Sequence, residues 1–249
     1  MNIWAHRGCS YAWPENTLHA FEAACQYPIT GIELDIQLTR DGKIVVIHDE
    51  KVDRTTNKVG KVKDLTLEEL KQLKIETHSA SHQRTEYTQI PTIEEVFRLV
   101  KPYCISKGIL INIELKNSVV RYEGMEDKIL ETVKKWGLEE YIIYSSFNPE
   151  SVRLLKEKDP SVKTGILAAS AFECLTYAES NPVDALHPYI KNLDVEKLRE
   201  KTKLPVRAWN VKRFEPFYPE QGTIEIQNLK ELEKAGVTDI FTNVPERYL

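Results

Sequence analysis

The sequence predicts an α/β fold: a TIM (β/α)8 barrel with a small insertion after its second barrel strand. Strand-like and helix-like segments alternate about eight times along 249 residues, which is the count for such a barrel. Several helix-like segments begin at explicit capping signals. Charged side chains recur at the expected carboxyl ends of the strands, where barrel enzymes place their active sites. We therefore expect one domain over residues 1–249, with the insertion at residues 50–91.

Apolar segments with strand character set the expected sheet. Nine segments have this character, and a barrel of eight strands does not need the segment 44–48. The short connection through Asp41-Gly42 favours an antiparallel hairpin between 44–48 and the strand before it. In chain order, the expected strands are 3–6, 32–37, 44–48, 109–115, 141–147, 163–168, 185–190, 205–211 and 239–243.

Helix-like segments lie between most of these strands. Capping boxes satisfy free backbone N–H groups at a helix start, and glycine ends a helix by taking the left-handed conformation. The expected helices are 16–26, 66–74, 92–101, 125–136, 149–158, 171–179, 195–202 and 228–235. Their signals are the capping boxes Thr66 with Glu69 and Thr92 with Glu95, the start at Asn148-Pro149, and the closing glycines Gly137 and Gly236.

Composition limits the classes of partner. No run of ~20 apolar residues is present, so we expect no integral membrane segment. A net charge of −4 without a basic block disfavours nucleic acid. The start of the chain lacks a secretory signal, and the scattered cysteines favour reduced thiols, so we expect a cytoplasmic protein. We expect a small-molecule partner and leave the oligomeric state open.

Glu33 and Asp35 pose the first functional question. In the stretch GIELDIQL the side chains alternate, so Ile32, Leu34 and Ile36 share one face and the two acids share the other. Two carboxylates on such an apolar strand repel each other. Burying them costs several kcal/mol each unless another group compensates.

The stretch INIELK (111–116) repeats this pattern, because Asn112, Glu114 and Lys116 share one face. A polar stripe that faces the lumen on two separate strands is hard to explain by packing. The candidates at the other strand ends are His6, Arg7, His48, Phe147, His187 and Trp209, of which we assign the last three to substrate binding.

Three carboxylates that meet in a barrel mouth repel strongly unless a cation lies among them. They are hard oxygen ligands, which favours one divalent cation, Mg²⁺ or Ca²⁺, over zinc. The expected metal ligands are Glu33, Asp35 and Glu114.

Arg7 and Lys116 add positive charge at the same place, and such groups bind phosphate and stabilise charge that develops on it. His6 and His48 supply the base and the acid that phosphodiester cleavage needs. The residues alone therefore predict metal-assisted phosphoryl chemistry. Each feature also has an ordinary structural explanation, such as a satisfied histidine or a salt-bridged acid. Together those explanations require five coincidences at strand ends.

The motifs resemble those of the glycerophosphodiester phosphodiesterases. AHRG, PENT, GIELDIQLTRDGKIVVIHDE, DRTTN, IPTIEEV and INIELK occur in the family's order and at similar spacing, over roughly residues 4–116. Weaker similarity follows in SSFNPESV, LHPYI, VRAWNV and GVTDIFTNVPE. The resemblance implies a TIM barrel that uses a divalent cation. It also implies hydrolysis of glycerophosphodiesters, such as glycerophosphocholine or glycerophosphoethanolamine, to sn-glycerol 3-phosphate and an alcohol.

The resemblance also implies roles for individual residues. In the mechanism proposed for the family, a glycerol hydroxyl attacks the phosphorus, a cyclic phosphate forms, and water opens it. The implied roles are His6 and His48 as acid and base, Glu33, Asp35 and Glu114 as metal ligands, Arg7 and Lys116 as phosphate contacts, and Glu15 and Asn16 as supporting groups.

The chain departs from the family pattern in three places. The usual Trp-Thr-Val-Asn reads WNVK at 209–212, and the usual Thr-Asp-x-Pro reads TNVP at 242–245. The segment 212–228 is longer than the usual link to the last helix. These changes leave the expected metal and acid–base positions intact and bear on the identity of the substrate.

Two other functions remain open. The same fold and metal could act on a lysophospholipid or a glycerol-phosphate polymer, in the manner of a phospholipase D, and Phe214, Phe217 and Tyr218 favour that alternative. A phosphoglycerol-binding barrel without turnover would require a damaged acid–base or metal set, and the sequence retains both sets.

Overall fold

A computed structural model describes residues 1–75, 89–193, 201–209 and 228–249. Each expected strand is found, with its ends shifted by at most a few residues, although the last two residues of 205–211 lie outside the described ranges. The strands are β1 (Asn2–His6), β2 (Gly31–Leu38), β3 (Ile44–Val46), β4 (Leu110–Leu115), β5 (Ile142–Ser146), β6 (Lys163–Ala168), β7 (Ala185–Pro188), β8 (Arg207–Trp209) and β9 (Asp239–Thr242).

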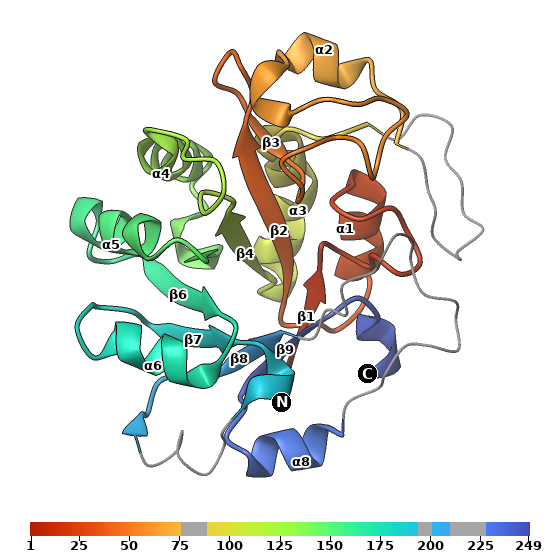
Figure 1. Ribbon diagram of the computed structural model, residues 1–249. Coiled ribbons are helices and arrows are strands. Elements are labelled where there is room, and N and C mark those ends of the chain that lie inside the picture. The colour runs from red at the N-terminus through yellow and green to blue at the C-terminus, as the bar shows by residue number, and fades with distance from the viewer. Residues whose placement is uncertain (76–88, 194–200, 210–227) are drawn as a thin grey trace.

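The parallel strands form one curved sheet in the order β7-β6-β5-β4-β2-β1-β9-β8 (Figure 1). The parallel bridges Leu186–Val206 and Tyr189–Trp209 join β7 to β8 and nearly close the barrel. β3 pairs antiparallel with β2, as the hairpin prediction required. The predicted TIM barrel is therefore confirmed.

Helices cover the outside of this barrel (Figure 1). The expected helix 195–202 falls almost entirely outside the described residues. The helices are α1 (Leu18–Cys25), α2 (Leu67–Lys71), α3 (Ile93–Lys107), α4 (Met125–Trp136), α5 (Pro149–Lys158), α6 (Ala171–Ala178) and α8 (Leu229–Lys234).

The capping signals act as predicted. Both capping boxes form, because each threonine accepts from the third helical N–H and the glutamate accepts from the threonine's own N–H. Asn148 caps α5, and Gly137 ends α4 in the left-handed conformation. Gly236 takes positive φ just after α8. The end of α4 and the start of α5 match the expected segments for this reason.

Three helix ends differ from the prediction by two residues or more. α2 ends at Lys71, with Gln72 as its C-cap, three residues before the expected end at 74. α1 begins at Leu18, because Asn16 has a φ of 56° and Thr17 is the N-cap. α3 continues through Pro102 to Lys107, where Gly108 caps it, although we expected it to end before the proline. Cys104 is fully buried in the last turns of α3, so packing holds that stretch in the helix.

The alternation of β2 separates the apolar core from the lumen. Ile32, Leu34 and Ile36 are fully buried and belong to the same apolar cluster as Phe21 of α1 and Phe97 of α3. The acids between them therefore face the inside of the barrel. The apolar side chains of β2 pack against the helices outside the barrel, and the polar side chains therefore lie in the lumen.

The chain between β3 and α3 carries α2 and a small apolar cluster of its own. Val45 of β3, Val52, Val62, Leu70 and Ile90 are buried together there. The division into one barrel domain with an insertion at 50–91 stays a prediction. Within the described residues, no helix combines the length and the apolar character needed to cross a bilayer.

Candidate active site

The acidic cluster predicted from the sequence forms in the barrel mouth. Asp35 of β2 lies opposite Glu114 of β4 in the parallel register, and Glu33 lies one pleat away on the same face. Each side chain offers an oxygen, and these three oxygens lie within 4.8 Å of one another. All three residues are buried, with 8% exposure or less.

Burial and mutual repulsion make this cluster costly without a cation. Burial, together with the charges of Asp35 and Glu114, raises the pKa of Glu33 well above its usual range. Burial alone would also raise the pKa of Asp35, but the charges of His48, Arg7 and Lys116 lower it. Glu33 Oε1 and Asp35 Oδ1 have no hydrogen-bond partner among the described residues. These unpaired hard oxygens fit a divalent cation such as Mg²⁺ or Ca²⁺.

Arg7 and Lys116 border the acids. Arg7 Nε lies 3.2 Å from Asp35 Oδ2, and the Arg7 backbone N–H donates to Glu33 Oε2 at 2.9 Å. Lys116 Nζ donates to Glu114 Oε1 at 2.8 Å and lies 3.9 Å from Asp35 Oδ1. Positive and negative groups thus alternate in a small volume, which suits a ligand with several anionic oxygens.

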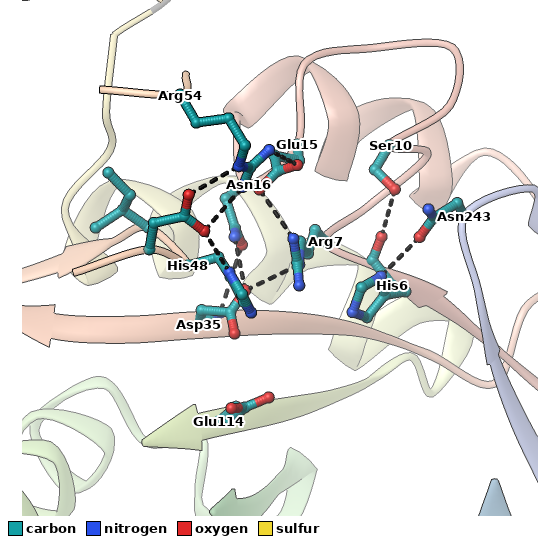
Figure 2. Close-up of polar contacts among 12 residues, drawn as sticks. His6, Arg7, Ser10, Glu15, Asn16, Asp35, His48, Arg54, Glu114 and Asn243 are labelled. Atoms are coloured by element: carbon teal, nitrogen blue, oxygen red, sulfur yellow. Dashed lines mark hydrogen bonds and ion pairs between the residues drawn. The ribbon is translucent and has the colours of Figure 1, made fainter. Parts of the chain in front are cut away.

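His6 ends β1 inside the barrel. Its Nδ1 lies 2.6 Å from Oδ1 of Asn243, a residue that follows β9 (Figure 2). Its Nε2 lies 3.8 Å from Glu33 Oε2. An amide oxygen only accepts, so Nδ1 carries the proton and Nε2 is left as an acceptor in the neutral ring. Burial, and then the charge of Arg7, lowers the pKa of His6 to about 3.

His48 follows β3 and is held differently. Its Nδ1 lies 2.6 Å from Asp49 Oδ1, and its side chain is 30% exposed. Arg54 Nε and one terminal nitrogen donate to the two oxygens of Asp49 at 2.7 and 3.0 Å. Burial would raise the pKa of Asp49, but the hydrogen bonds from His48 and Arg54 hold it well below its usual range. A carboxylate therefore orients His48, where an amide orients His6.

The PENT turn joins these groups. Glu15 accepts from both terminal nitrogens of Arg54 at 2.9 and 2.7 Å, and from Arg7 at 3.0 Å (Figure 2). Asn16 Nδ2 donates to Asp35 Oδ2 at 2.8 Å. One continuous chain of charged contacts thus runs from His48 to the acidic cluster.

A cavity of about 320 Å³ opens between these side chains. Phe147 at its rim is 37% exposed, and its ring meets the Trp209 ring edge-on at 5.7 Å. Tyr189 also packs on Trp209, with 4.7 Å between ring centroids. The lining residues are His6, Arg7, Glu33, His48, Asn112, Glu114, Ser145, Phe147, Leu167, His187, Trp209 and Phe241.

The structure brings the site residues predicted from the sequence to one place. Most of them line the cavity. Four of them do not line it but contact the residues of the site. Asp35 and Glu15 contact Arg7, Asn16 contacts Asp35, and Lys116 contacts Glu114. Their individual roles stay predictions.

Sequence reasoning missed several residues of this site. Asp49 directly follows His48, and Arg54 lies in the DRTTN motif, so both had a local signal. Asn243 was noted only as a departure from the family pattern. Ser145 had no signal, because its position inside the barrel follows only from the pairing of β4 with β5.

The chain is similar to known phosphodiesterases. The profile described as "Glycerophosphoryl diester phosphodiesterase family" matches residues 6–247. A glycerophosphodiester phosphodiesterase of Caldanaerobacter subterraneus subsp. tengcongensis is 40% identical over 247 residues, which cover 98% of this chain and 94% of that protein. The Bacillus altitudinis enzyme of the same name is 39% identical over 252 residues, with coverages of 98% and 95%.

A solved structure is similar over the whole barrel. It is that of an Oleispira antarctica phosphodiesterase in complex with the product sn-glycerol-3-phosphate, and the TM-score is 0.76 at 26% sequence identity. The similarity covers 99% of this chain and 94% of the other.

Proposed function

The chain belongs to the glycerophosphoryl diester phosphodiesterase family, and we propose that it hydrolyses glycerophosphodiesters to sn-glycerol 3-phosphate and an alcohol with the help of a divalent cation. Membership confirms the enzyme class predicted from the sequence, a phosphoric diester hydrolase. The observation that carries the proposal is the buried carboxylate cluster beside two basic side chains and two histidines at one cavity.

In this proposal Glu33, Asp35 and Glu114 hold the cation, for which Mg²⁺ and Ca²⁺ are the candidates. The bound cation supplies positive charge that offsets the three carboxylates and stabilises negative charge on the phosphoryl oxygens. Arg7 and Lys116 bind the remaining phosphate oxygens. Both basic groups lie within ion-pair distance of the acids. A bound phosphate would replace the carboxylates as the partner of these basic groups.

His6 acts as the base and His48 as the acid in the first step. His6 Nε2 takes the proton of the attacking glycerol hydroxyl, since the contact with Asn243 keeps the other ring proton on Nδ1. A bond forms between that hydroxyl oxygen and phosphorus, and the bond from phosphorus to the alcohol oxygen breaks. His48 gives a proton to the leaving alcohol, because the contact of its Nδ1 with the Asp49 carboxylate orients the ring. The two roles reverse when water opens the cyclic phosphate.

Two further expectations accompany the proposal. The four cysteines are buried free thiols, the state found in a reducing compartment, and this supports the cytoplasmic location expected from the sequence. Phe214, Phe217 and Tyr218, which favoured a lysophospholipid or a glycerol-phosphate polymer, lie outside the described residues. Small glycerophosphodiesters are the proposed substrates because the family match and the named relatives support them.

A panel of diesters assayed with and without metal tests the proposal. Release of sn-glycerol 3-phosphate should stop after exhaustive chelation and return with Mg²⁺ or Ca²⁺. Glu114→Gln should raise the metal concentration needed for half-maximal activity, since it removes one anionic ligand. Glu69→Gln, a change in the exposed pair with Arg40, is the matched control. Full activity in chelator would contradict the metal requirement, and release of no product from any diester would contradict the function.

A further inference from the structure

Behind the acidic cluster, the cavity has a second polar surface that no step of the proposed mechanism uses. We call it the floor and define it by Asn112 of β4, Ser145 of β5 and His187 of β7. All three side chains are at least 98% buried, and all three line the cavity. They come from strands that run side by side through β6.

Gly165 of β6 makes room for the imidazole of His187. A Cβ atom at Gly165 would lie 2.3 Å from His187 Nε2, so any other residue would displace the ring. The Phe241 ring lies 5.4 Å from the imidazole, and Trp209 Nε1 donates to the His187 carbonyl at 3.0 Å. Packing and hydrogen bonding therefore fix the His187 ring in the floor of the cavity.

The floor has unused hydrogen-bonding capacity. His187 Nδ1, His187 Nε2 and Asn112 Oδ1 are buried without a hydrogen-bond partner among the described residues. Asn112 Nδ2 donates to Ser145 Oγ at 2.8 Å, which orients both side chains. Buried polar atoms in proteins are nearly always paired, and leaving one unpaired is costly. Three such atoms at one cavity indicate a ligand with polar groups.

The chemistry of the floor selects the kind of group. Burial, and then the charge of Arg207, holds the pKa of His187 well below its usual range, so the ring is neutral. A neutral imidazole presents one donor and one acceptor, and Asn112 Oδ1 adds an acceptor. An anion would need donors alone and an ammonium group would need acceptors alone. A hydroxyl group, which donates and accepts, matches this set.

We propose that His187, Asn112 and Ser145 bind the terminal hydroxyl of the substrate's glycerol unit, an inference that rests on the proposed function. The glycerol unit is the same in every substrate, whereas the alcohol varies in size and must reach solvent. The enclosed floor suits the invariant part, and the exposed rim at Phe147 suits the variable part. The floor thereby makes the enzyme selective for glycerol over shorter or deoxygenated diols.

Two diesters that share one alcohol test the inference. One carries glycerol; the other carries propane-1,2-diol, which keeps the attacking hydroxyl and lacks the terminal one. We expect the wild-type enzyme to prefer the glycerol diester by about 10- to 100-fold in kcat/KM, because the deoxy diester leaves the floor unpaired. His187→Phe should bring that ratio close to one, and Ser145→Ala should lower it a few-fold. His187→Gln, which keeps a donor and an acceptor, should retain part of it.

His19→Phe is the matched control, because His19 stacks on Trp13 outside the cavity, and it should keep the wild-type ratio. If His187→Phe fails to fold, Ser145→Ala and His187→Gln decide the question. If the wild type uses both diesters equally, the proposed role of the floor is contradicted and the proposed function is not. A variant that loses both diesters by the same factor assigns the floor a structural role and also overturns the inference. Hydrolysis of neither diester by the metal-loaded wild type contradicts the proposed function and removes the inference with it.

Discussion

Strands β1, β2 and β4 bring ionisable side chains to the cavity, with Asn112 of β4 as the neutral exception, whereas β5, β6, β7, β8 and β9 bring mostly neutral and aromatic ones. On the first side Arg7 contacts both Glu33 and Asp35, and Lys116 contacts Glu114. On the second side the contacts are ring against ring, as between Phe147 and Trp209. The difference indicates a division in which the first side performs the reaction and the second side selects the substrate.

Within the charged side, the two histidines are held unequally. His6 is buried against the amide of Asn243, while His48 is partly exposed and bonded to a carboxylate. Arg54 donates to that carboxylate and to Glu15 at once, so its side chain ties the region after β3 to the PENT turn. The acid–base pair is therefore supported from two separate parts of the chain.

The largest expected effect comes from removing a histidine. His6→Ala and His48→Ala should each lower kcat by about 10²–10⁴, because each removes a proton transfer. If the first side performs the reaction, every diester in a panel should lose the same factor. Steady-state kinetics and a thermal unfolding transition at the wild-type temperature check this, with His19→Ala as the control. Near-wild-type turnover in either variant would remove that histidine from the mechanism.

Much of the charged side could be predicted from the sequence, because strand alternation alone places Glu33 and Asp35 on one face and the resemblance covers the same stretch. Contacts between distant residues could not be predicted this way. Arg54 and Glu15 are 39 positions apart, and no local pattern joins them. The floor could not be predicted from the sequence for a similar reason, since the space that Gly165 leaves for His187 exists only once β6 and β7 pair.

The same limit applies to the fold. Capping signals gave the end of α4 and the start of α5, because a cap is a local interaction. The predicted end of α3 was wrong, because burial of Cys104 outweighs the local effect of Pro102. Features fixed by neighbouring residues are readable in the sequence, and features fixed by packing are not.

A smaller effect is expected at Arg54. Arg54→Lys keeps the charge but cannot hold Asp49 and Glu15 through paired N–H groups, so His48 loses its fixed orientation. We expect kcat to fall about tenfold, with KM little changed. Arg40→Lys is the matched control, since Arg40 forms an exposed pair with Glu69 away from the cavity. If the two variants have equal kcat, Arg54 has no positioning role.

The smallest expected effect lies at the rim and tests the neutral side directly. Phe147 is exposed where the variable alcohol should leave the cavity, and its ring packs on Trp209. Phe147→Ala removes apolar contact area that a large alcohol would cover and a small one would not. We expect KM to rise about three- to tenfold for diesters of bulky apolar alcohols, with kcat unchanged and small alcohols unaffected.

Phe172→Ala provides the comparison, because Phe172 is an exposed phenylalanine of α6 that does not line the cavity. Phe172 is 68% exposed, more than Phe147, so a general effect of losing an exposed ring on solubility or stability should appear in both variants. A changed order of kcat/KM across the panel in Phe147→Ala alone would place alcohol selection on the neutral side. An unchanged order would mean that the ring packs on Trp209 without contacting the substrate, and the division between the two sides would then rest on the floor.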